Sequence, residues 1–184
     1  MSTAATTQTG VTTWSIDPAH SHVEFAVKHL MISTVKGRFG IVHGTVSTDE
    51  ADPSKAQVEV EIDADSIDTR EGQRDTHLKS ADFFDVEKFP KLSFRSTRIH
   101  DVDGADFKLT GDLTIHGLTR PVTLEVTSEG QGKDPWGGER AGFSAKGKIK
   151  RSEFGLTWNQ VLETGGFVVG DDIKISLDVE LVKK

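Results

Sequence analysis

The chain has 184 residues, which suits a single domain, and its 35% hydrophobic and 28% charged residues are typical of a soluble globular protein. The formal net charge of −7 argues against a nucleic-acid partner, because there is no basic excess to neutralise phosphates. The sequence contains no cysteine, which excludes disulfide scaffolds and thiolate metal sites.

The first twelve residues are small and polar, so we expect a disordered tail over 1–12 and one domain over 13–184. The tail lacks the basic and apolar segments of a secretory signal. No apolar run approaches the ~18 residues that a membrane-spanning helix needs. These features favour a cytoplasmic location and a protein that does not span a membrane.

Most of the chain alternates between apolar and polar residues, with the period of two that is typical of half-buried β-strands. The alternation covers 23–29, 35–48, 56–63, 91–102, 107–115, 121–127, 141–150 and 173–182. About eight strands joined by short turns predict an all-β fold with an antiparallel barrel or sandwich. A closed barrel is favoured because closure removes exposed sheet edges.

One long segment, 66–90, breaks the alternation. It is rich in charged residues, has Thr69 as a candidate N-cap, and contains no proline over 70–80, which together predict a helix. In a β-protein, such an insert commonly forms a plug, lid or binding loop. We expect it to cover one end of the barrel, either as a lid or as a simple seal. The other irregular segment, 151–170, is expected to form a helical turn at 158–163.

Histidines are the main candidates for metal or acid–base chemistry, because no nucleotide-binding or hydrolase motif occurs. His20 and His22 form an H-x-H pair, and His29 or His77 could supply a third ligand. No third ligand has the spacing of a known metal motif, so the sequence assigns no metal and no catalytic residue. A metal-dependent enzyme that uses these histidines is the alternative hypothesis.

Arg74, Asp75 and His77 form a compact polar set within the insert. They could act as a gate that contacts a ligand head group, or Arg74 could anchor the insert through an ion pair. Anchoring is favoured, since such pairs more often orient structure than bind ligands. His20 and His29 are assigned to the same class of gate or structural residues.

Large apolar side chains on the predicted inward faces could fill a core or line a cavity for an apolar guest. A purely structural module with a filled core therefore stays open. The predicted lumen residues are Phe25, Val27, Phe39, Ile41, Phe83, Phe84, Leu92, Phe94, Leu113, Ile115, Phe143, Trp158 and Phe167.

Several motifs carry a family resemblance: WSIDPAHSHVEFAVKHL (14–30), VKGRFG (35–40), SIDT (66–69), RDTHLKSADFFD (74–85), GDLTIHGLTRPV (111–122) and RSEFGL (151–156). In this order they resemble the YceI-like polyisoprenoid-binding family from residue 14 to the C-terminus. The resemblance implies an eight-stranded, lipocalin-like barrel, often a homodimer, which holds a polyisoprenoid, an isoprenoid quinone or a similar lipid. It implies no catalysis and no cofactor besides the bound lipid.

Overall fold

The computed structural model of the protein describes residues 10–40 and 42–184. The strands are β1 (Val11–Ile16), β2 (His22–His29), β3 (Ser33–Phe39), β4 (Val42–Asp49), β5 (Gln57–Asp63), β6 (Ile67–Asp68), β7 (Lys91–Asp103), β8 (Asp106–Ile115), β9 (Leu118–Lys133), β10 (Glu139–Lys150) and β11 (Val169–Lys183). The helix α1 (Gly72–Lys79) and the short 3₁₀ helices Pro53–Lys55, Ala64–Ser66 and Arg151–Phe154 complete the elements. Most of the predicted tail lies outside the described residues, but β1 already begins at Val11, inside the predicted range.

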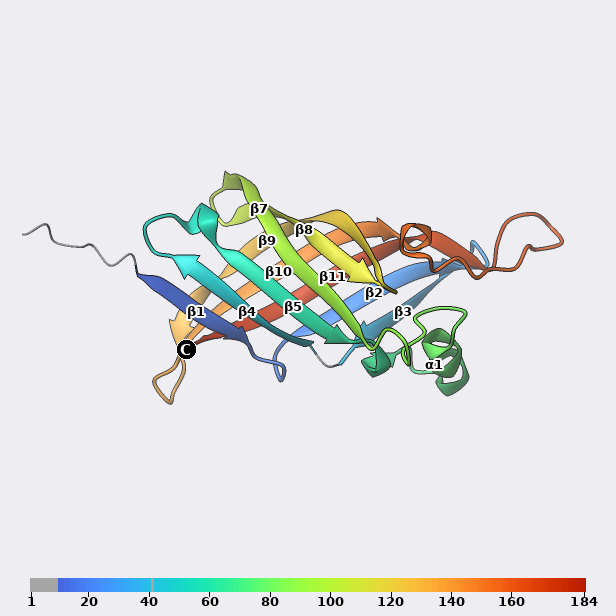
Figure 1. Cartoon of the computed structure of the whole chain (residues 1–184), viewed down its shortest axis with the longest axis horizontal. Coiled ribbons are helices and arrows are strands. Elements are labelled where there is room, and N and C mark those ends of the chain that lie inside the picture. Colours follow the sequence, from blue (N-terminus) through green and yellow to red (C-terminus); the bar gives the residue numbers. More distant parts are fainter. Residues whose placement is uncertain (1–9, 41) are drawn as a thin grey trace, which may run out of the picture.

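The sheet closes on itself. Its hydrogen-bonded order runs β1-β4-β5-β7-β8-β9-β10-β11, and β11 then pairs with β1, which joins the two edges. All of these pairings are antiparallel. Towards one end of the barrel, β2 takes the place of β1 beside β11, β3 takes that of β4, and β6 takes that of β5. There β2 pairs with β11 and β3, and β3 pairs with β6. The predicted eight-stranded antiparallel barrel is therefore confirmed (Figure 1).

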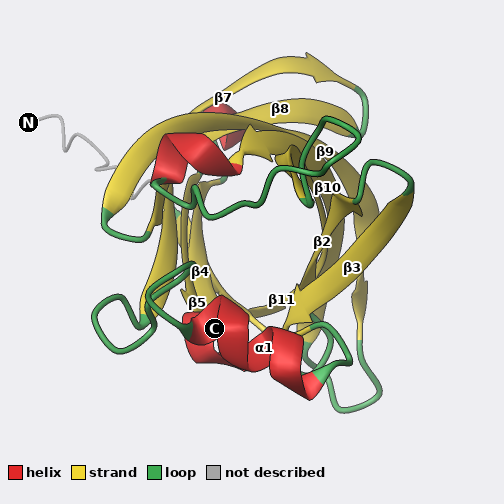
Figure 2. Cartoon of the chain, turned by 90° about the vertical axis from the view of Figure 1, so that its right-hand side faces the viewer, coloured by secondary structure: helices red, strands yellow, loops and turns green. Residues whose placement is uncertain are grey.

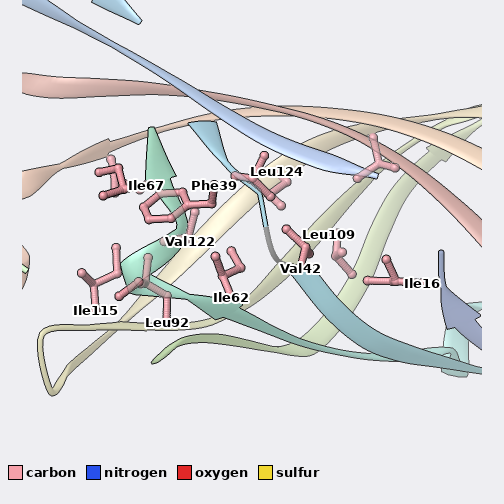
Figure 3. Close-up of a cluster of buried hydrophobic side chains, with 14 of the residues drawn as sticks. Ile16, Phe39, Val42, Ile62, Ile67, Leu92, Leu109, Ile115, Val122 and Leu124 are labelled. Carbon is pink, nitrogen blue, oxygen red and sulfur yellow. The ribbon is translucent and has the colours of Figure 1, made fainter. Parts of the chain in front are cut away.

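Apolar side chains face the inside of this barrel. Along β11 the odd-numbered positions Ile173, Ile175 and Leu177 are partly buried and the even-numbered positions from Lys174 to Asp178 are exposed, as the period of two requires. The fully buried part of the core draws on strands all round the ring, and Figure 3 shows side chains of β1, β3, β4, β5, β7, β8 and β9 gathered in it. The core is thus the interior of a single closed sheet.

The two ends of the barrel differ. One end, which we call the mouth, carries α1, the β2–β3 turn and the loop between β10 and β11 (Figure 1, right). Figure 2 looks onto the mouth and shows α1 lying across its rim. The opposite end carries both the β9–β10 loop and the C-terminus.

The predicted helix of the insert is confirmed, although its N-cap is Glu71 rather than Thr69. The Glu71 carboxylate accepts hydrogen bonds from the backbone N–H groups of Gln73 and Arg74. The predicted helical turn at 158–163 is wrong, since those residues are not helical. Instead, a 3₁₀ helix forms at Arg151–Phe154.

The loop between β10 and β11 is organised by a buried arginine. The Arg151 guanidinium is 6% exposed and donates hydrogen bonds to four backbone carbonyls, those of Leu156, Trp158, Val169 and Gly170. Apart from the 3₁₀ helix Arg151–Phe154 this loop has no helix or strand of its own, so its backbone carbonyl groups need such partners. Burial lowers the pKa of Arg151, but an arginine keeps its charge at any ordinary pH.

Where the chain passes from β1 to β2, an ion cluster on the outside of the barrel ties the β1–β2 turn to the β9–β10 loop, β10 and β11. Arg140 of β10 donates to Asp17 at 2.8 Å, to Asp134 at 2.9 Å and to Glu180 at 2.5 Å. His20 Nδ1 lies 2.8 Å from Asp17 Oδ2, the same oxygen that accepts the hydrogen bond from Arg140. Hydrogen bonds from His20 and Arg140 lower the pKa of Asp17 to about 2, and the Asp17 carboxylate raises the pKa of His20.

We expect Asp17→Asn to destabilise the protein in a pH-dependent manner. Asp17 contributes stability above its unfolded pKa of about 3.9, and this contribution is lost as the pH falls through the folded pKa of about 2. The part of this stability that depends on protonated His20 is present at lower pH and is lost as the pH rises through the raised pKa of His20.

Urea unfolding midpoints of wild type and Asp17→Asn should therefore differ most near about pH 5 and converge towards about pH 2. The exposed Glu163, in the loop before β11, provides the control Glu163→Gln, for which the gap from wild type should be small at both pH values. A gap for Asp17→Asn that stays constant with pH would contradict this assignment.

Candidate ligand-binding lumen and its mouth

One side of the inner wall is apolar and incompletely covered. On neighbouring strands, cross-strand partners line up as Ile173 with Val27, Ile175 with Phe25, Leu177 with Ala145, and Val179 with Phe143. We call these eight residues the lumen stripe. All of them except Val27 pack against the core, yet each of the eight is only partly buried although it faces the inside of a closed sheet. Part of their surface therefore stays accessible to solvent.

The lumen stripe is long and carries no ionisable side chain. From Ile173 to Val179 it covers six residue steps, which corresponds to roughly 20 Å at about 3.3 Å per residue. A guest lying along it would meet only aliphatic and aromatic groups. Such a wall favours a long apolar molecule and offers nothing that could act as an acid, a base or a nucleophile.

Glycines let two large rings lie close to the wall. A Cβ added to Gly37 would come within 2.4 Å of the Phe25 ring, and a Cβ on Gly111 would come within 2.4 Å of the Phe94 ring. Each ring therefore occupies the place of the missing side chain on the neighbouring strand. Any larger residue at Gly37 or Gly111 would displace a ring from the wall towards the centre of the barrel.

The structure places most of the predicted lumen residues on the inner face. Those that are partly buried there are Phe25, Val27, Phe94, Leu113 and Phe143, and those that are fully buried are Phe39, Leu92 and Ile115. Phe167 lies outside the lumen, contrary to the prediction, because its loop turns outward and leaves the side chain 54% exposed. Ile41 lies outside the described residues.

Aromatic contacts join the insert to the loop between β10 and β11 at the mouth. The His77 ring lies edge-on to Trp158 with centroids 4.7 Å apart and edge-on to Phe83 at 5.1 Å, and Phe83 and Trp158 are 5.4 Å apart. We call these three residues the mouth cluster. On the inner side, Phe84 contacts Phe39 edge-on at 5.7 Å. The predicted residues Phe83, Phe84 and Trp158 thus lie at the mouth, and the two irregular segments cover it together.

Within the insert, α1 is anchored by hydrogen bonds to a buried threonine that directly follows β6. Thr69 is 5% exposed, and both its backbone N–H and its hydroxyl donate to Asp75 Oδ1, at 2.9 and 2.5 Å. Arg74 donates from Nε to the Thr69 hydroxyl at 2.7 Å and from its terminal nitrogen to the Thr69 carbonyl at 2.9 Å. Arg74 therefore anchors the insert, as the sequence favours, but through Thr69 and not through the predicted ion pair.

The remaining gate candidates are spread over the molecule. His77 belongs to the mouth cluster, and its Nε2 lies 2.8 Å from the carboxylate of Asp82. His29 ends β2 at the mouth. His20 lies near the opposite end of β11, beside Asp17 on the outer surface, so it cannot act at the mouth.

The two histidines of the H-x-H pair have different carboxylate partners. His22 pairs with Asp178 at 3.3 Å, whereas His20 pairs with Asp17. Asp17, His20 and Glu180 offer ligand atoms within 4.8 Å of one another. However, the Arg140 guanidinium already binds both carboxylates of that group and supplies its positive charge.

Sequence reasoning missed three parts of this arrangement. The strict alternation over 173–182 could have placed the β11 residues of the lumen stripe in the site, since it marks an inward face. Thr69 and Arg151 gave no usable signal, because a lone threonine and a lone arginine in irregular segments are usually exposed.

Within the part of the chain that the structure describes, no helix has the length and apolar character of a membrane span.

We expect Asp75→Leu to loosen the insert while leaving the barrel intact. The substitution removes the acceptor of two hydrogen bonds and leaves the buried Thr69 N–H without it, which costs about 1–3 kcal/mol. Amide hydrogen exchange should accelerate over 67–90 and stay unchanged in β9 and β10.

The matched control is Asp65→Leu, since Asp65 lies in the 3₁₀ helix at the start of the insert and pairs on the surface with Lys79 at 3.3 Å. This exposed pair should contribute little, because solvent screens it. Equal exchange rates in wild type and Asp75→Leu would show that Asp75 does not hold the insert.

Comparison with known proteins places the chain in a family. The model of the YceI-like domain matches residues 14–181. Protein YceI from Salmonella newport (strain SL254) is 47% identical over 138 residues, which cover 75% of this chain and 72% of that protein. Among solved structures, the YceI protein of Campylobacter jejuni has a TM-score of 0.70 and 35% identity, covering 85% of this chain and 90% of that one.

More distant structures share the architecture. BcnA from Burkholderia cenocepacia has a TM-score of 0.78 and 26% identity, covering 90% of this chain and 98% of that one. A domain from Saccharophagus degradans, described as polyisoprenoid binding, has a TM-score of 0.64 at 14% identity, over 93% of this chain and 98% of its own, and so shares the fold. The family match over nearly the whole barrel and the 47% identity to a YceI protein agree with the closed sheet and its covered mouth, and this chain belongs to the YceI-like family.

Proposed function

We propose that this protein binds a long apolar lipid of the polyisoprenoid class, such as an isoprenoid quinone, inside its barrel and does not act as an enzyme. The observation that carries the proposal is the lumen stripe, an apolar inner surface that keeps accessible area within a closed sheet. Membership of the YceI-like family and the fold shared with the polyisoprenoid-binding domain of Saccharophagus degradans support it.

The physics of this site favours chain length over head-group chemistry. Each methylene that moves from water to an apolar wall contributes about 0.8 kcal/mol, so affinity grows with the length of chain that fits along the lumen stripe. Methyl-branched chains suit a wall of Ile, Val, Leu and Phe because such side chains leave irregular gaps. The mouth cluster then shields the open end from water.

A search for bound lipid gives the first test. Native mass spectrometry of gently purified protein should show added mass that organic extraction removes, and the extract should contain an isoprenoid or a comparable long-chain lipid. Protein that carries no extractable lipid and does not take up an added isoprenoid quinone would overturn the proposal.

We expect Ala145→Trp to block the lumen. Ala145 faces the inside beside Leu177, so an indole there would occupy the space next to the lumen stripe. Affinity for an added isoprenoid quinone should fall at least about tenfold, which corresponds to about 1.4 kcal/mol.

Lys146→Trp is the matched control, because Lys146 is the next residue on the same strand, faces outward and is exposed. It should bind the quinone as wild type does. Circular dichroism and thermal unfolding check that Ala145→Trp folds, and Leu177→Gln provides a second lumen variant of similar size to the original residue. Wild-type affinity in both lumen variants would place the ligand elsewhere.

A further inference from the structure

Large apolar side chains are exposed together at the mouth. The β2–β3 turn presents Leu30, Met31 and Ile32, which are 36%, 66% and 82% exposed. The loop before β11 presents Val161 and Phe167, which are 76% and 54% exposed. We call these five residues the apolar rim. Exposed apolar groups scattered singly need no explanation, but a group of five at one end of a molecule marks an interaction surface.

The two loops that carry the apolar rim are joined. The backbone N–H of Leu30 donates to the carbonyl of Val168 at 2.8 Å, and Val161 pairs with Phe167 in an isolated β-bridge. The Met31 sulfur sits against Gly166, where an added Cβ would come within 2.2 Å of it. A surface pocket of about 500 Å³ lies between the loops, with Met31 and Phe167 in its wall. The rim is therefore one continuous surface built from two separate segments.

The turn places its apolar residues outward at a conformational cost. Leu30 and Met31 have φ values of 52° and 61°, in the left-handed region that favours glycine and asparagine. Neither side chain is fully buried in return, since Leu30 remains 36% and Met31 66% exposed. Strained positions of this kind persist where function needs them.

The charge around the turn is opposite in sign to that of the whole chain. Residues 25–48 contain Lys28, Lys36 and Arg38 and no aspartate or glutamate, within a protein of net charge −7. Lys28 and Lys36 lie on the outer faces of β2 and β3, below the tip, and neither forms an ion pair within the described residues. Arg38 lies 3.8 Å from Asp68.

The segment between β10 and β11 contributes the exposed acidic groups Glu153 and Glu163, and the start of β11 adds Asp171 and Asp172, of which Asp172 pairs with Lys148 and Lys150. Glu163 is exposed between Val161 and Phe167, and the Asp171 carboxylate accepts hydrogen bonds from the backbone N–H and hydroxyl of Ser152. Asp171 is thereby turned towards the protein. The charged side chains that flank the β2–β3 turn on its own two strands, Lys28, Lys36 and Arg38, are all cationic.

An apolar tip flanked by free lysines fits the surface of a bilayer that contains anionic lipids. The apolar groups enter the boundary between head groups and acyl chains, while the lysines remain among the phosphates. A second copy of the chain fits less well, because a two-fold contact through the same patch would bring Lys28 and Lys36 close to their own counterparts. Two protruding loops are also a poor shape for a flat dimer interface.

We propose that the apolar rim docks the protein onto an anionic bilayer and thereby presents the mouth to the membrane, from which an apolar ligand enters the lumen. The exchange of ligand rests on the proposed lipid-binding function, whereas the docking itself does not. The mouth cluster includes Trp158 of the same loop that carries Val161 and Phe167, so the apolar rim adjoins the entrance to the lumen.

Vesicle co-sedimentation tests the docking. Wild type should bind vesicles of equal parts phosphatidylcholine and phosphatidylglycerol, more weakly so at high salt, and bind least to phosphatidylcholine alone. The double variant Ile32→Ser with Phe167→Ser should lower partitioning at least about tenfold, since two large apolar groups are removed from the bilayer. Lys28→Gln with Lys36→Gln should weaken binding to the anionic vesicles and reduce its dependence on salt.

Trp136→Ser is the matched control, because Trp136 is 86% exposed in the β9–β10 loop at the opposite end of the barrel. Its partitioning should equal that of wild type. If the rim variants partition as wild type does, or if Trp136→Ser weakens binding as much as they do, the proposal is overturned. It is equally overturned if sedimentation velocity shows that the rim variants break a dimer while their vesicle binding is unchanged.

Failure of lipid binding would look different from failure of docking. Ala145→Trp should still co-sediment with vesicles but carry no quinone away from them. The rim variants should bind quinone supplied in detergent as wild type does, yet load it more slowly from vesicles. Loading from vesicles at the wild-type rate in the rim variants would contradict a role of the rim in ligand entry.

Discussion

The pairing of β1 with the end of β11 is the constraint on which the rest of the structure depends. It joins the first strand of the chain to the last and turns an open sheet into a ring, so that one face of every strand is enclosed. An open sheet of this composition would leave Ile173, Ile175 and Leu177 facing water. Within the ring the same side chains form a sheltered apolar surface, and Arg140 of β10 reinforces the join from outside by binding Asp17, directly after β1, and Glu180 of β11.

Closure also explains why the two ends of the molecule can have different roles. A ring has no free edges, and its backbone groups are satisfied within the sheet, so the loops at each end are free to vary without loosening the wall. At the mouth, the insert and the loop before β11 are each fixed by a buried polar residue, Thr69 and Arg151 respectively. Fixed in this way, they meet at His77 and Trp158 and cover the opening while the β2–β3 turn remains exposed beside them.

The contacts at the mouth show where local sequence information ends. The helix of the insert was predictable because it is a local property, yet its first residues differ from the prediction, since Thr69 satisfies Asp75 inside the insert instead of capping the helix. Phe167 was expected in the lumen because its residue type is typical of cores. Its loop is held by Arg151 and by the bond from Leu30 to Val168, and these contacts direct the side chain outward. Both cases depend on partners that are distant in the sequence or in an irregular segment.

The sequence by itself determined most of the strands, the face of each strand that is apolar, the place of the insert and the family, because alternation, turn residues and motifs are properties of short stretches. The alternation over 35–48 predicted one strand, where the structure has β3 and β4, and the first residues of β1 fell in the predicted tail. Only the tertiary structure decided that the sheet closes between β1 and β11, that the exposed β2–β3 turn meets the loop before β11, and that Ile175 and Leu177 stay only partly buried on the inner wall. The physical reason is that closure, packing and residual space depend on the strand register and on how rings such as Phe25 settle over Gly37. Neither can be read from the type of residue at one position.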